Sequence, residues 1–208
     1  MMVVLRTKYR SILPFVAVFI LSIAALLSLI AMRFGETANT AFLLVQLVAI
    51  PLSSTICLYL FYDVYEGKHS ALLPQIYKNR VNRILLSHVT LFMVPLLICG
   101  LYIKIQYGHF DLLASYALFV SQLFMLNGSM LLFYMLVKDI QIVIATLVLY
   151  LSVEIGTFGS VRHIYHFLYF NLDVAVSFSS VSYLIVSNTL VGVIAYIGIK
   201  IKSQQKIG

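Results

Sequence analysis

The pattern of hydrophobic and polar positions divides the chain into six long apolar stretches, with longer connecting segments at residues 63–83 and 159–177. The apolar stretches are continuous and are more than 18 residues long. A helix needs about 20 apolar residues to cross a hydrocarbon core of roughly 30 Å, whereas a transmembrane β-strand alternates in polarity. The pattern therefore predicts an all-α membrane protein with six transmembrane helices, over residues 11–32, 40–62, 84–105, 112–137, 140–158 and 179–199.

The first apolar stretch is preceded by Arg6, Lys8 and Arg10, as in a secretory signal. The stretch is too long for the apolar region of a signal, and residues 33–36 lack a small-residue cleavage site. We therefore predict a retained first span.

Composition supports the membrane assignment. The 208 residues are 62% hydrophobic and 10% charged, with a mean hydropathy of +1.02, which a soluble domain does not tolerate on its surface. No repeat or composition shift marks a second domain, so residues 1–208 are expected to form one transmembrane domain.

Lysine and arginine are distributed unequally between the two predicted sides. Eleven lie on the side that holds both termini and residues 63–83, and three (Arg33, Lys104 and Arg162) lie on the other. Positively charged segments resist translocation, so both termini are expected in the cytoplasm of a plasma-membrane protein. This bias and attraction to anionic membrane lipid explain the net charge of +7 without a nucleic acid partner.

The segment between the second and third spans carries the most informative pattern. Its apolar residues recur at helical spacing between polar and basic ones, and Pro74 can occupy the first turn. This predicts an amphipathic cytoplasmic helix at the membrane surface, over residues 64–81. The alternative is an interfacial linker helix that basic residues anchor to lipid headgroups.

The segment between the fifth and sixth spans, residues 159–177, is aromatic but too short and polar to cross the membrane. We expect an outer re-entrant or interfacial helical hairpin there. His163 and His166 share a helical face, and with Asp173 they are candidate zinc ligands. A closed zinc site needs a fourth group, so interfacial anchoring is the favoured interpretation.

Three polar residues inside spans are candidates for a substrate path. Glu154 is a carboxylate within the fifth span, where burial is costly unless the group is neutral or partnered. Asn127 and His88 are more simply explained as helix-packing residues. Cys57 and Cys99 lie in apolar stretches and are interpreted as core side chains.

The topology and one short motif resemble the ABC-2 family of ABC exporter permeases. The motif residues are Glu66 and Gly67, then Leu72, Leu73 and Pro74, then Lys78 and Arg80. Pro74 follows Gly67 sooner than in the family pattern, and His88 lies near the place where the family often has a lysine.

The resemblance implies that residues 64–81 are a coupling helix that docks on a separate ABC ATPase subunit. The coupling residues would be Glu66, Gly67, Leu73, Ile76, Tyr77, Lys78 and Arg80. The chain would work as a homodimer, or as a heterodimer with a second permease, to export a peptide (an antimicrobial peptide included), lipid or drug. It contains no phosphate-binding loop motif, so ATP and Mg²⁺ would bind on the partner ATPase, and no cofactor or metal is expected in this chain.

Two other functions stay open at this point. One is a substrate-binding membrane subunit of an importer, which needs no basic amphipathic helix between the second and third spans. The other is a stand-alone intramembrane enzyme, which needs paired catalytic groups. Within the spans Glu154 is the single carboxylate, and His88 lies far from it in sequence, so a transport subunit rather than an enzyme is the prediction.

Overall fold

A computed structural model describes residues 17, 19–32, 37–65, 80–157, 166–171 and 173–204 of the chain. Over these residues the protein is helical and contains no strand. Five helices are long and apolar enough to cross a membrane, and a shorter apolar helix spans Phe19–Ala31. The long helices are α2 (Ala38–Tyr65), α4 (Val81–Tyr107), α5 (Leu112–Val137), α6 (Ile140–Thr157) and α7 (Phe178–Gln204).

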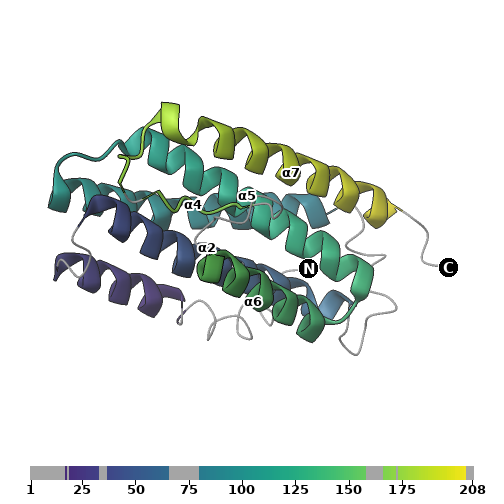
Figure 1. Ribbon diagram of the computed structural model, residues 1–208. Helices are drawn as coiled ribbons and strands as arrows, with labels where there is room; N and C mark the ends of the chain where they lie inside the picture. Colours follow the sequence, from purple (N-terminus) through teal and green to yellow (C-terminus); the bar gives the residue numbers. More distant parts are fainter. Residues whose placement is uncertain are drawn as a thin grey trace.

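The helices lie side by side in one bundle and alternate in direction along the chain (Figure 1). Helices α2, α5 and α7 therefore run parallel to one another, and α4, α6 and the short helix run the opposite way. The side where α2, α5 and α7 end and α4 and α6 begin is called the basic end here. It holds Arg80, Arg83, Lys138, Lys200 and Lys202, whereas the opposite end of the described bundle holds Lys104.

Helix α5 is the centre of the bundle, because it contacts α2, α4, α6 and α7. Burial differs strongly among its neighbours. In the apolar part of α2, 72% of the residues are buried, whereas the value is 22% in both α6 and α7. Helices α6 and α7 therefore present most of their apolar surface outward, as expected for helices that face lipid.

The most extensive helix contact, between α5 and α7, depends on small residues. Gly192 lies against Phe124: a Cβ atom at position 192 would be 2.5 Å from the Phe124 Cδ1. Gly128 lies opposite Ala195, which would be 3.4 Å from an added Cβ. Small residues let the two backbones approach closely, which is how helices associate where water supplies no driving force.

Short turns with clear capping join the later helices. Asp111 begins α5 by accepting the backbone N–H groups of Leu113 and Ala114, both at 3.1 Å. Lys138 ends α5 in a left-handed conformation, with φ 57°. Asp139 then accepts the N–H of Gln141 at 2.9 Å and starts α6. These caps satisfy backbone groups that a helix end leaves unpaired.

The boundaries of the last five predicted spans agree closely with the five long helices. Of the first predicted span, the described part forms the short helix Phe19–Ala31. Most of the predicted coupling helix, residues 66–79, lies outside the described residues. The helical hairpin predicted between α6 and α7 is not confirmed: residues 166–171 are non-helical where described, and residues 158–165 lie outside the description.

Candidate functional site

A row of buried polar side chains runs along the contact between α2 and α5. Gln46 and Ser53 lie seven residues apart on α2, and Gln122 and Asn127 face them from α5; all four are 0% exposed. Two helical turns separate the two α2 residues, which places two polar layers about 10 Å apart. We call these four residues, together with His88, Glu154 and Asn188, the polar seam.

In the first layer, two glutamine side chains hold each other and a piece of irregular backbone. Gln122 Nε2 donates to Gln46 Oε1 at 2.7 Å and to the carbonyl oxygen of Phe167 at 2.6 Å. Gln46 Oε1 also accepts the backbone N–H of Tyr169 at 3.0 Å. These partners fix the orientation of both amides. The backbone N–H of Tyr169 requires an oxygen from Gln46, and the carbonyl oxygen of Phe167 requires the NH₂ group of Gln122.

Glu154 belongs to this layer and lies in the last turn of α6. Its side chain is 0% exposed, and its Oε1 accepts the backbone N–H of Phe167 at 2.9 Å. The Nδ1 atom of His166 lies 3.7 Å from the same oxygen. Glu154 thus contacts the segment that follows its own helix rather than a distant helix.

The segment held by these side chains enters the bundle without helical structure. Phe167, Leu168 and Tyr169 have buried side chains, and residues 166–171 and 173–177 run beside the helices toward the start of α7 (Figure 1). Asn188 on α7 adds a contact of 3.5 Å from its Nδ2 to the carbonyl oxygen of Phe167. Irregular backbone inside a membrane bundle needs such partners, because no water is available to it.

The second layer joins α2, α4 and α5 through Ser53. Its Oγ lies 3.2 Å from His88 Nε2 and accepts a hydrogen bond from Asn127 Nδ2 at 3.3 Å. His88 Nε2 is also 3.0 Å from the Ser53 carbonyl oxygen, and its ring lies 4.3 Å from that of Phe92. Here the histidine is packed against aromatic and polar groups inside the bundle.

The polar seam retains hydrogen-bonding capacity that protein atoms do not use. The buried atoms without a hydrogen-bond partner in the described structure include Gln46 Nε2, Gln122 Oε1, Asn127 Oδ1 and Glu154 Oε2. Buried polar atoms are normally paired, and each such exception needs an explanation. Together these atoms are one donor and three acceptors with unused hydrogen-bonding capacity.

The structure brings together some of the predicted site residues. His88 and Asn127 meet at Ser53, and Glu154 lies in the other layer of the same seam. Of the predicted coupling residues, Arg80 is exposed at the start of α4, and the others, Glu66, Gly67, Leu73, Ile76, Tyr77 and Lys78, lie outside the described residues.

Sequence reasoning did not select Gln46, Ser53, Gln122 or Asn188. A signal for the first two was present, because polar residues seven positions apart in an apolar helix share one face. No comparable signal linked them to Phe167, whose backbone they help to hold.

No metal centre is formed by the described residues, since no group of three His, Cys, Asp or Glu side chains lies close enough together. His163 of the predicted pair lies outside the description. His166 is directed to Glu154 instead, at 3.7 Å.

Comparison of the chain with protein-family models, with curated proteins and with solved structures finds no match.

Proposed function

We propose that this chain is the membrane permease subunit of an ATP-driven exporter that moves a hydrophobic or amphipathic substrate out of the cell. The observation that carries the proposal is the polar seam in the interior of an apolar bundle. Ionisable groups at membrane depth are costly, and in membrane proteins they mark substrate and ion pathways. The unpaired atoms of Gln46, Gln122 and Glu154 supply polar contacts for an amphipathic substrate along such a path.

The order of the helices supports coupling to a separate ATPase. The segment 66–79 lies in the chain between α2 and α4, and these two helices meet in the seam through Ser53 and His88. A push on this segment at the basic end is transmitted along two rigid helices to the second layer of the seam. Movement of α2 then also displaces Gln46, and with it the first layer.

The chemistry of ATP belongs to the partner in this proposal. ATP and Mg²⁺ bind to an ABC ATPase subunit, and two permease chains, identical or different, complete the exporter. Peptides, lipids and drugs are the substrate classes that match an apolar bundle with a polar interior.

The test is co-purification in mild detergent after expression with the neighbouring genes. We expect an ATPase subunit to purify with the chain, and the triple variant Glu66→Lys, Lys78→Glu, Arg80→Glu to lose it. The matched control is the double variant Lys138→Glu, Lys202→Glu, which reverses charges at the same end of the bundle but outside the segment. The control should retain the ATPase.

Each other outcome has a definite meaning. A chain that purifies alone in every preparation contradicts the exporter proposal and favours a stand-alone membrane protein. An ATPase that stays bound to the triple variant favours the importer subunit, which needs no coupling helix between α2 and α4. If the control variant loses the ATPase to the same extent, the ATPase is recruited by general surface charge. That result contradicts a dedicated coupling segment.

A further inference from the structure

A second polar feature lies apart from the seam, at the basic end of the bundle. A pocket of about 360 Å³ opens between the first turn of α4 and the last turns of α7. This volume lies in the range of about 300–1,000 Å³ that is usual for small-molecule sites. Its lining residues are Asn82, Arg83, Leu86, Tyr196, Lys200, Ser203 and Gln204.

The charge of the pocket favours an anion. Arg83 and Lys200 come from different helices, no acidic side chain lines the pocket, and neither cation forms an ion pair within the described residues. Helix α4 also begins beside the pocket. The N–H groups of this first turn add partial positive charge.

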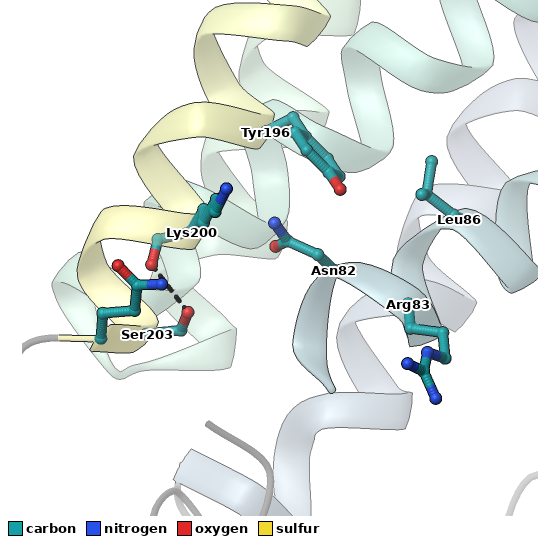
Figure 2. A pocket seen from close by; sticks show the side chains of 7 residues that line it. Asn82, Arg83, Leu86, Tyr196, Lys200 and Ser203 are labelled. Carbon is teal, nitrogen blue, oxygen red and sulfur yellow. Dashed lines mark hydrogen bonds between the residues drawn. The ribbon is translucent and has the colours of Figure 1, made fainter. Parts of the chain in front are cut away.

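The polar groups inside the pocket add hydrogen-bonding selectivity. Figure 2 shows the amide of Asn82 and the ammonium group of Lys200 directed into the space below Tyr196, with Arg83 at the rim. The amide of Asn82 can both donate and accept a hydrogen bond. A ligand that fits therefore carries a negative group for Lys200 and a hydroxyl group for the Asn82 amide.

The walls of the pocket continue into surface of the kind that faces lipid. Leu86 lies one helical turn beyond Asn82 toward the middle of α4, and it is 42% exposed. Val193 lies on the same face of α7 as Tyr196 and Lys200, and it is 41% exposed. An acyl chain attached to a bound headgroup has apolar surface to follow, which a soluble anion does not need.

We propose that this pocket binds the headgroup of an anionic glycerophospholipid whose headgroup bears hydroxyl groups, as in phosphatidylglycerol. Lys200, with Arg83 at the rim, neutralises the phosphodiester, and the Asn82 amide forms a hydrogen bond with a headgroup hydroxyl. Leu86 and Val193 contact the start of the acyl chains. Basic pockets between helices at the cytoplasmic face are a general means of binding anionic lipids, and this site is independent of the exporter proposal.

The experiment is a lipid titration of the full-length protein in detergent, followed by native mass spectrometry. The probes are phosphatidylglycerol and phosphatidylcholine with the same acyl chains. We expect phosphatidylglycerol to bind at least about tenfold more tightly, and Lys200→Gln to remove about tenfold of that affinity, as for loss of a hydrogen bond to a charged group. The matched control Lys202→Gln, which removes a charge outside the pocket, should bind as the unaltered protein does.

Two further arms separate the alternatives. Glycerol 3-phosphate is added as a soluble competitor and should not displace the lipid; displacement at equal concentration would overturn the proposal in favour of a soluble phosphate site. Equal weakening by Lys200→Gln and Lys202→Gln would overturn the proposal in favour of diffuse surface attraction, as would equal binding of phosphatidylcholine.

Asn82→Leu is a second variant, and its unfolding temperature should equal that of the unaltered protein. The variant should no longer prefer phosphatidylglycerol, which bears the headgroup hydroxyl groups, over phosphatidic acid.

Discussion

At the scale of single residues, the buried polar side chains of this protein serve the backbone. Glu154, Gln46 and Gln122 all bond to main-chain atoms of Phe167 or Tyr169. Removing such a partner leaves a backbone group unpaired in an apolar interior, which costs more than the hydrogen bond itself contributes. The transport role proposed for these residues therefore requires that they hold residues 166–169 at the same time.

Glu154 allows a direct test of this structural role. Glu154→Leu leaves the N–H of Phe167 without its acceptor and should lower the free energy of unfolding by about 1–3 kcal/mol. Glu154→Gln keeps an oxygen acceptor at that position and should have a smaller effect. Thermal unfolding in detergent measures both, with Ser152→Leu on the exposed face of α6 as the control. Equal stability of Glu154→Leu and the unaltered protein would contradict the assigned contact.

The pair Gln46 and Gln122 predicts energetic coupling between α2 and α5. A double-mutant cycle with Gln46→Leu and Gln122→Leu should give a coupling free energy of about 0.5–2 kcal/mol, because each side chain bonds directly to the other. Gln46→Leu combined with Gln141→Leu, an exposed position at the opposite end of the bundle, should give none. Additive effects for the first pair would show that the two amides do not depend on each other.

At the scale of elements, close approach of α5 and α7 determines which polar groups can meet. Asn188 and Gly192 lie one turn apart on the same face of α7. The Asn188 side chain contacts Phe167, and the backbone at Gly192 packs against Phe124. A larger residue at position 192 would therefore move α7 away from α5 and also withdraw Asn188 from the seam. Packing and polar contact are coupled along this helix face.

Gly192→Val is the corresponding variant. Its Cβ would collide with Phe124 and lie 3.3 Å from the Met125 Cα, so we expect a loss of about 1–3 kcal/mol in the free energy of unfolding, as in overpacked cores. Gly156→Val is the matched control, because a Cβ there meets nothing within 4 Å. Unfolding of both variants in detergent should separate them clearly, and similar losses would mean that only the helical conformation of glycine matters.

At the scale of the whole molecule, charge is polarised along the bundle axis. Arg80, Arg83, Lys138, Lys200 and Lys202 lie at one end, and Lys104 lies near the other. Such a distribution orients a membrane protein with its basic end in the cytoplasm. We therefore predict that the proposed coupling segment and the proposed lipid pocket both face the cytoplasmic leaflet, with residues 166–169 nearer the outer face.

Cysteine accessibility tests this orientation. His109 lies in the exposed turn between α4 and α5, and Lys138 lies in the exposed turn between α5 and α6. A membrane-impermeant maleimide should label His109→Cys in intact cells and Lys138→Cys only after permeabilisation. The native Cys57 and Cys99 are buried and should stay unlabelled. Labelling of both introduced cysteines from one side would rule out a bundle that spans the membrane.

The amino-acid sequence by itself determined that this is a membrane protein, and it determined most of the helix boundaries. The predicted span 112–137 coincides with α5 (Leu112–Val137), and the predicted span 140–158 differs from α6 by one residue. The reason is physical: bilayer thickness sets the length of an apolar stretch, and Asp111 and Asp139 at the helix starts are local capping signals. Neither depends on which helices become neighbours.

The tertiary structure alone decided which polar residues meet. Gln46 and Gln122 are read as isolated amides in two apolar stretches, and their contact with each other and with Phe167 depends on how α2 and α5 are rotated and on how residues 166–169 enter the bundle. The pocket that joins Asn82 to Lys200 likewise exists because α4 and α7 lie side by side. Hydropathy averages over all sides of a helix, so it cannot specify rotation or neighbours; close packing at Gly128 and Gly192 does.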